Sequence, residues 1–166
     1  MENKFYMYKG TMYPACLKQG HAAENILHFA SFFCKGKGLD IGGLKDSHYP
    51  GAKIINKNFP DEYHAFNLPA KKFDYIFSSH TLEHILECRA ALMYWKWHLK
   101  KDGVLFLYLP HPDMEYWHPG NDLKHHHIFT PEEISSLLKD CKYDVMACSK
   151  RDSFYSFSVV ALNGGK

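Results

Sequence analysis

Residues 80–84, His-Thr-Leu-Glu-His, are of types that could bind a metal. On an α-helix, His80 and His84 would lie one turn apart with Glu83 beside them, the spacing of an H-x-x-E-H zinc-peptidase site. Such a site also needs a third ligand and a water for which Glu83 acts as base. The preceding stretch, 73–79, is typical of a buried strand, so His80 lies in the turn before regular helix. His80 and His84 then need not share a face, and we predict no metal.

A second histidine-rich stretch, residues 111–130, follows an apolar run and is punctuated by proline and glycine. Its length and aromatic content are typical of a lid that closes over a bound substrate. His111 or Asp113 could take up a proton from that substrate, because the ordinary pKa of histidine lies near neutrality. The alternative is a surface loop with exposed histidines, which we favour for the triplet at 125–127.

The elements that must position these residues follow from the spacing of apolar side chains. Apolar runs predict a strand and tight turn at 38–43, and strands at 52–58, 73–79, 104–110, 143–150 and 154–162. Helical spacing predicts helices at 21–36, 81–103 and 130–141. Thr81 and Thr130 are the expected N-caps, and Gly36 and Gly103 the expected C-terminal ends.

Alternating strands and helices predict an α/β fold with a mostly parallel sheet, closed by an antiparallel C-terminal strand pair. We expect one domain over residues 1–166, with an N-terminal segment and helix at 1–36 and the lid at 111–130. Such folds bind ligands beyond the carboxyl ends of their strands. Those ends lie at 42–43, at 56, at 78–80 and at 110–113.

Composition narrows the class of protein. The net charge is +2 and no run of lysine and arginine reaches the length of a nucleic-acid-binding arm. The five cysteines form no C-x-x-C pair, which favours reduced thiols and a cytoplasmic protein. No apolar stretch approaches the length of a membrane span. We therefore expect neither a nucleic acid nor a membrane as partner.

Three stretches in order, KGLDIGG, KKFDYIFSSHTLEHI and LKKDGVLFLYLP, resemble successive motifs of class I S-adenosylmethionine-dependent methyltransferases. The closest group is the small-molecule, type-11-like kind, with an L-E-H segment after its fourth strand. The resemblance runs from about residue 37 to residue 110. It implies a Rossmann-like fold, S-adenosyl-L-methionine as cofactor, and transfer of a methyl group to O or N of a small-molecule or glycan-like acceptor.

The resemblance also implies which residues bind the cofactor, each set following a strand. They are Asp40, Gly42 and Gly43 at the glycine turn, Asn56 for the ribose, Asn67 and Leu68 for the adenine, and Ser78, Ser79 and His80 near the reacting methyl group.

The chain departs from the family pattern in three places. Leu44 and Asp46 replace further glycines, and Asn56 replaces an acid, which leaves hydrogen bonding to hydroxyls without a charge. The connection 44–51 is shorter than the roughly 10–12 residues of a helical crossover, so the helices after the glycine turn look reduced or absent. A thinly covered sheet face would favour a partner protein or a second copy of the chain, as in a homodimer. The alternative function is a catalytically inactive methyltransferase-like binding or assembly module.

Overall fold

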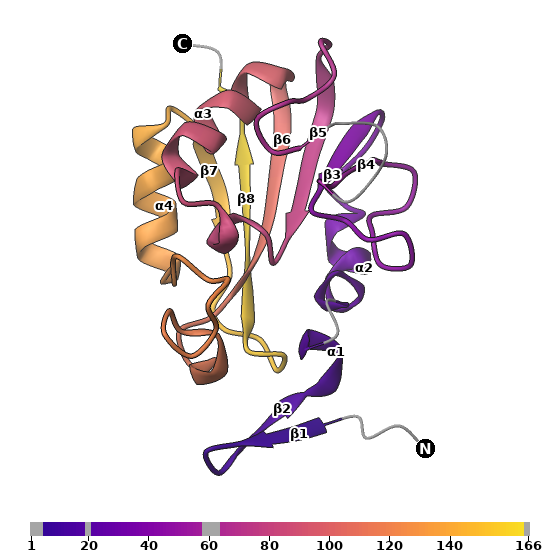
Figure 1. The fold of residues 1–166 in the computed structure, drawn as a ribbon. Helices are drawn as coiled ribbons and strands as arrows, with labels where there is room; N and C mark the ends of the chain where they lie inside the picture. The colour runs from indigo at the N-terminus through magenta and orange to yellow at the C-terminus, as the bar shows by residue number, and fades with distance from the viewer. Residues whose placement is uncertain (1–4, 19–20, 58–63, 165–166) are drawn as a thin grey trace.

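A six-stranded mixed sheet forms the centre of the computed structural model, which describes residues 5–18, 21–57 and 64–164 (Figure 1). The strands lie in the order β4-β3-β5-β6-β8-β7. Their bounds are β3 (Gly38–Ile41), β4 (Lys53–Ile55), β5 (Phe73–Ser79), β6 (Leu99–Pro110), β7 (Asp144–Cys148) and β8 (Ser156–Leu162). The first four in the order are parallel, and β8 runs antiparallel to both of its neighbours. The predicted Rossmann-like α/β fold with an antiparallel C-terminal pair is confirmed.

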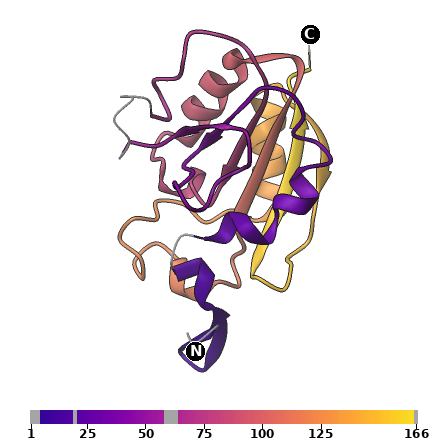
Figure 2. The same ribbon diagram turned by 90° about the vertical axis from the view of Figure 1, so that its right-hand side faces the viewer.

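Each face of the sheet has its own apolar core, because β5 and β6 carry large apolar side chains on both sides. Helices α3 (Cys88–His98) and α4 (Pro131–Asp140) cover one face. The other face is covered by the 3₁₀ turn η1 (Ala22–Asn25) and by α2 (Leu27–Ala30), which follow the short helix α1 (Ala15–Lys18) (Figure 2). The helix expected over 21–36 is thus two short helical turns.

Helix α4 begins as predicted. The Thr130 hydroxyl accepts a hydrogen bond from the Glu133 backbone N–H, and the Glu133 carboxylate accepts one from the Thr130 N–H. This capping box, with Pro131 in the first turn, fixes where the 111–130 segment ends.

The helix predicted over 81–103 is wrong at both ends. After β5 the chain forms only a 3₁₀ turn, η2 (Leu82–His84), and α3 starts at Cys88. Thr81 does not cap it; its hydroxyl donates to the Ser79 carbonyl at 2.9 Å. The Glu83 carbonyl accepts instead from the backbone N–H groups of residues 126 and 127, so contact with a distant segment overrides helical propensity. At the other end the helix stops at residue 98, and Gly103 lies inside β6.

An N-terminal hairpin, β1 (Phe5–Tyr8) and β2 (Thr11–Pro14), was not predicted. Its turn at Lys9 and Gly10 has positive φ at both residues, as tight hairpin turns require. The Tyr8 ring packs edge-on against Tyr116, 5.2 Å between centroids, and the Lys9 ammonium lies 2.8 Å from the Glu115 carboxylate. The hairpin therefore supports the segment predicted to be a lid.

The connection after β3 is short, and the described part of the connection after β4 contains no helix. Residues 42–52, all of which the structure describes, contain turns and bends but no helix, as the compressed spacing predicted. Residues 64–72 form no strand, only an isolated bridge between His64 and Asn67, and 58–63 lie outside the described residues. In the described parts of the chain, no helix combines the length and apolar character needed to cross a bilayer.

Candidate functional site

The glycine turn after β3 packs tightly against Thr81, in the segment that follows β5. Gly42 has φ +94°, and a Cβ built on it would lie 1.8 Å from the Thr81 hydroxyl oxygen. A Cβ on Gly43 would lie 2.7 Å from the carboxyl carbon of Asp40. Both positions therefore require glycine, and the turn packs closely against Thr81 and Asp40 at the carboxyl end of β3.

Asp40, in β3, stabilises the loop that follows this turn. Its side chain is buried, and the carboxylate accepts a hydrogen bond of 2.6 Å from the Tyr49 backbone N–H. Burial raises the pKa of Asp40 to about 7, although the backbone N–H groups of Tyr49 and Gly43 act in the opposite direction. Asp40 thus fixes the loop from 42 to 49.

Three further positions predicted to bind the cofactor, Asn56, Asn67 and Leu68, differ in their surroundings. The Asn56 side-chain amide donates to the Gly43 carbonyl at 3.1 Å and weakly to the Gly42 carbonyl at 3.4 Å. Leu68 is buried and its backbone N–H donates to the Tyr94 hydroxyl at 3.1 Å, whereas the neighbouring Asn67 is exposed.

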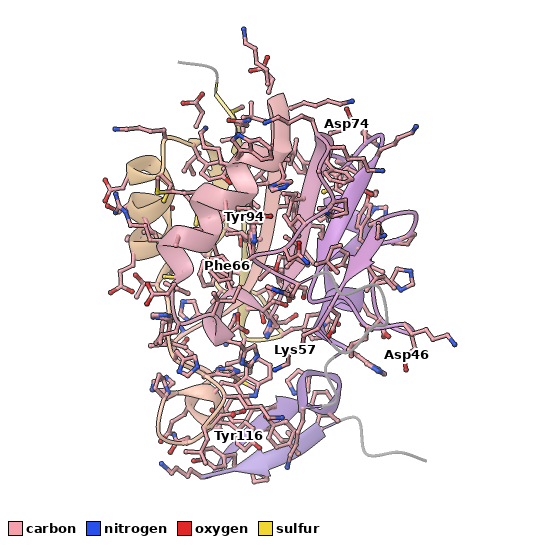
Figure 3. All side chains as sticks on the ribbon, turned by 45° about the horizontal axis from the view of Figure 1, so that its top comes forward. Asp46, Lys57, Phe66, Asp74, Tyr94 and Tyr116 are labelled. Atoms are coloured by element: carbon pink, nitrogen blue, oxygen red, sulfur yellow. The ribbon has the colours of Figure 1, made fainter. Side chains whose placement is uncertain are left out.

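Helix α3 holds the segment 64–68 in place. The Trp95 indole donates to the Ala65 carbonyl at 2.8 Å, and the Tyr94 ring lies 6.3 Å from the Phe66 ring (Figure 3). These contacts explain how a segment without regular secondary structure keeps Leu68 beside the sheet.

Replacing Tyr94 with phenylalanine is expected to destabilise the protein by about 1–2 kcal/mol, because the Leu68 N–H loses its acceptor in a partly buried setting. Urea unfolding measures this change. Met93→Leu, at an exposed position of the same helix, serves as control and should lie within about 0.5 kcal/mol of the wild type. Equal stability of Tyr94→Phe and the wild type would contradict the anchoring role.

Three consecutive residues predicted to lie near the cofactor, Ser78, Ser79 and His80, stand at the end of β5. The Ser78 hydroxyl donates to the Ile41 carbonyl at 2.9 Å, which joins β5 to β3. The Ser79 hydroxyl is buried and has no hydrogen-bond partner within the described residues. His80 has φ +47° and its ring packs edge-on against Trp117, 4.8 Å between centroids. As predicted, His80 lies in the turn before any helix.

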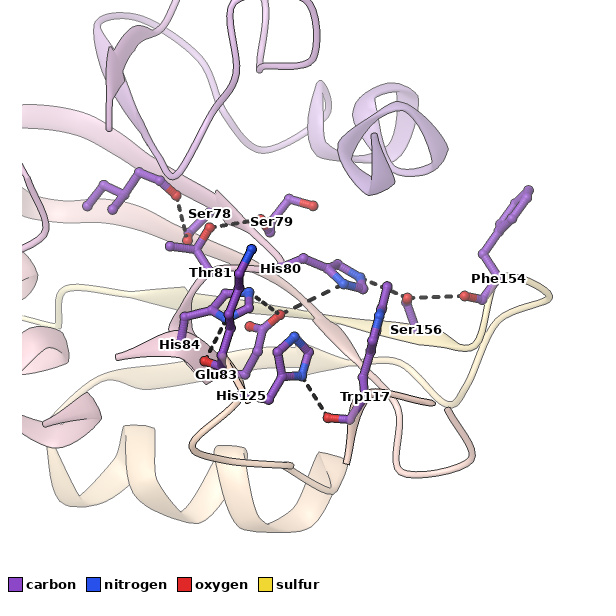
Figure 4. Close-up of polar contacts among 12 residues, drawn as sticks. Ser78, Ser79, His80, Thr81, Glu83, His84, Trp117, His125, Phe154 and Ser156 are labelled. Carbon is purple, nitrogen blue, oxygen red and sulfur yellow. Dashed lines mark hydrogen bonds and ion pairs between the residues drawn. The ribbon is translucent and has the colours of Figure 1, made fainter. Parts of the chain in front are cut away.

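The His80 imidazole is held as a neutral ring. Burial lowers its pKa to about 3, and the neighbouring rings of His125 and His84 act in the same direction. The Ser156 hydroxyl donates to the Phe154 carbonyl, so the His80 Nε2–H donates to the Ser156 oxygen, 2.9 Å away (Figure 4). Its Nδ1 lone pair then faces Glu83.

Glu83 is fully buried, and neither of its carboxyl oxygens has a hydrogen-bond partner within the described residues. Its Oε1 lies 3.8 Å from His80 Nδ1 and 4.0 Å from His84 Nε2. Burial raises the pKa of this carboxyl to about 8. His125, expected to be exposed in its triplet, is also buried here, with its ring 4.4 Å from the His84 ring.

The segment 111–130 contains the 3₁₀ turn η3 (Glu115–Trp117) and lies at the carboxyl end of β6. His111 Nδ1 lies 3.5 Å from an Asp113 carboxylate oxygen, and Arg151 lies 3.0 Å from the other oxygen. The His111 backbone N–H donates to the Tyr155 carbonyl. These two residues thus contact the segment before β8, whereas the residues predicted to bind the cofactor lie around β3, β4 and β5.

Sequence reasoning missed Glu83 and His125 as members of one cluster. Glu83 stands in the quoted motif, but His125 reaches it only through the fold of the 111–130 segment. No spacing in the sequence indicates that contact.

Comparison with solved structures finds the same fold in methyltransferases. The 1,6-didemethyltoxoflavin-N1-methyltransferase of Burkholderia thailandensis, with bound 1,6-didemethyltoxoflavin and S-adenosylhomocysteine, matches with a TM-score of 0.68 at 15% identity, over 90% of this chain and 81% of that one. A SAM-dependent methyltransferase of Thermotoga maritima matches with a TM-score of 0.63 at 17% identity, over 89% and 92%. The N-methyltransferase NodS of Bradyrhizobium japonicum, in complex with S-adenosylhomocysteine, gives 0.61 at 14%, over 89% and 87%.

No curated protein matches the sequence. A family model described as a methyltransferase domain matches residues 18–147, which is most of the chain. The chain therefore belongs to the class I S-adenosylmethionine-dependent methyltransferase family, whose cofactor is S-adenosylmethionine, as the ordered motifs predicted.

Proposed function

We propose that this protein transfers a methyl group from S-adenosylmethionine to N or O of a small-molecule or glycan-like acceptor. The observation that carries the proposal is the glycine turn at the end of β3, which is so tight that a Cβ on Gly42 or Gly43 would clash with Thr81 or Asp40. A turn of this kind lets a ligand approach the main chain closely.

The residues present fit the cofactor. When bound, it supplies a methyl group on a sulfonium, which is already a good leaving group. Gly42 and Gly43 would accept the methionine part, the Asn56 amide would bind the ribose hydroxyls, and Leu68 would lie against the adenine with Asn67 beside it. The buried Ser79 hydroxyl, without a partner among the described residues, is available to a ligand at the end of β5. Asp40 acts through the turn, as its bond to Tyr49 indicates.

The chain's own contribution to methyl transfer is mainly alignment and exclusion of water. The segment 111–130 is proposed as the lid over the acceptor, with Trp117 packed against His80 at its inner side. A neutral His80 presents no positive charge that would repel a sulfonium. His111 and Asp113 stay the proposed proton acceptors, with Arg151 fixing the Asp113 carboxylate.

Two structural neighbours favour nitrogen as the methylated atom. One is named as an N1-methyltransferase and the other as an N-methyltransferase, and both were solved with S-adenosylhomocysteine. They support the class of reaction and leave the identity of the acceptor to experiment.

The test is transfer of a labelled methyl group. The full chain is incubated with S-adenosylmethionine labelled in the methyl group and with fractionated small-molecule extract. We expect label to appear in a small-molecule fraction and Gly42→Ala to abolish it. Binding of S-adenosylhomocysteine without transfer to any fraction would contradict methyl transfer.

The second candidate is a catalytically inactive module that binds or assembles with a partner. Two features near the glycine turn favour it. Residues 42–52, fully described, lack the helix whose N-terminus would face the ligand, and Leu44 and Asp46 stand where glycines are expected. Methyl transfer to any extract component would remove this candidate.

A further inference from the structure

Three side chains from two separate segments converge at the turn after β5. Glu83 and His84 come from η2, and His125 comes from the 111–130 segment (Figure 4). One potential ligand atom from each lies within 4.8 Å of the others. We call these three residues the Glu83 cluster.

Hydrogen bonds fix which ring nitrogens face the centre of the cluster. The Lys124 carbonyl lies 2.9 Å from His84 Nδ1, and the Trp117 carbonyl lies 2.7 Å from His125 Nδ1. A carbonyl only accepts, so each Nδ1 carries the hydrogen and each Nε2 keeps a lone pair. His84 Nε2 faces Glu83, and Figure 4 shows the remaining ring nitrogen of His125 on the Glu83 side.

The ring nitrogens that face Glu83 are therefore all acceptors. Glu83 is fully buried and both carboxyl oxygens lack a hydrogen-bond partner within the described residues. The His80 Nδ1 lone pair faces the same oxygen from 3.8 Å. Lone pairs gathered in a buried site repel one another and are stabilised by a cation placed between them.

The distances suit a metal better than a shared proton. His84 Nε2 lies 4.0 Å from Glu83 Oε1, beyond the range of a hydrogen bond. Two ligands about 2.0–2.1 Å from one Zn²⁺ ion lie about 3.3–4 Å apart, so a small side-chain rotation completes the site. Two imidazoles and a carboxylate form a known zinc ligand set that keeps one coordination position open, and backbone carbonyls that orient both rings are typical of metal sites.

We propose that Glu83, His84 and His125 bind one Zn²⁺ ion. The ion would join the 111–130 segment to the turn that follows β5, directly beside His80, and so fix the lid over the proposed acceptor site. His80 is placed to serve as a fourth ligand. Nitrogen ligands of this kind disfavour Mg²⁺ and Ca²⁺. The proposal goes beyond methyl transfer and does not depend on it.

Direct metal binding tests the proposal. The untagged full chain is freed of metal with a chelator, and Zn²⁺ is titrated by calorimetry, with elemental analysis after gel filtration. We expect one Zn²⁺ per chain, no binding of Mg²⁺, and visible absorption bands when Co²⁺ takes its place. Absence of stoichiometric Zn²⁺ from the wild type would overturn the proposal.

Variants distinguish this site from other histidines. His84→Ala and His125→Ala are expected to weaken Zn²⁺ binding by at least about 100-fold. His126→Ala is the matched control, because His126 is the exposed neighbour in the same triplet, and it should bind like the wild type. His84 is one-third exposed, so His84→Ala tests the site even where loss of the buried His125 ring unfolds the chain. Wild-type Zn²⁺ affinity in His84→Ala would overturn the assignment.

Discussion

Replacing Gly42 with alanine is expected to weaken binding of S-adenosylhomocysteine by at least about 100-fold, since displacements of about 1 Å can have effects of this size at a reacting centre. The alanine Cβ would lie 1.8 Å from the Thr81 hydroxyl oxygen and 2.7 Å from its Cβ. Either the glycine turn or the chain after β5 must move, and both border the proposed cofactor site. The positive φ of Gly42 adds about 1–3 kcal/mol of backbone strain.

Gly51→Ala is the matched control for this substitution. Gly51 also has positive φ, +80°, but a Cβ there meets nothing within 4 Å. It therefore carries comparable backbone strain without the clash. Calorimetric titration should show near wild-type affinity for Gly51→Ala and loss for Gly42→Ala. Equal affinity in the two variants would show that the turn does not contact the cofactor.

The second large effect concerns Asp40 and pH. Its pKa is raised by burial to about 7 in the folded protein, whereas an unfolded aspartate titrates near pH 4. Between these two values the folded state keeps a proton that the unfolded state has released, so stability falls as pH rises. The contribution is fully present below about pH 4 and is lost by about pH 7, with a size of up to about 4 kcal/mol.

Asp40→Asn should remove this dependence, because the amide cannot titrate while its oxygen still accepts from the Tyr49 N–H. The free energy of unfolding in urea, measured from pH 4 to pH 8, should show the wild type losing stability relative to Asp40→Asn as pH rises. Asp46→Asn, at an exposed position of the same loop, should follow the wild type. Parallel curves for Asp40→Asn and the wild type would mean that Asp40 is ionised when folded.

The sheet could be predicted because short, continuous stretches of sequence are enough to indicate its strands. β5 and β6 are nearly continuous apolar runs, as strands buried on both faces must be, and Thr130 with Glu133 forms a cap within four residues of chain. The region from 81 to 87 could not be predicted in this way. Its apolar spacing is helical, but the backbone there is set by the 111–130 segment, which bonds to the Glu83 carbonyl.

In the candidate site, too, the features set by local sequence could be predicted, and those set by contacts between distant residues could not. The glycine turn was predicted because a positive φ and a close approach leave glycines in the sequence. The hydrogen bond of the buried Asp40 carboxylate could not be predicted, since its donor is the backbone N–H of Tyr49, which belongs to no motif. The histidine triplet gave no sign that His125 is buried while His126 is exposed, because only the packing of Trp117 and the turn after β5 separates them.

Calorimetric titration of the untagged wild-type chain with S-adenosylhomocysteine tests the central claim most directly. The account predicts saturable binding at one molecule per chain, a matching rise in thermal stability with S-adenosylmethionine, and loss of both in Gly42→Ala but not in Gly51→Ala. No heat and no thermal shift with either molecule would contradict it, and the chain would then be a methyltransferase fold that does not bind the family's cofactor.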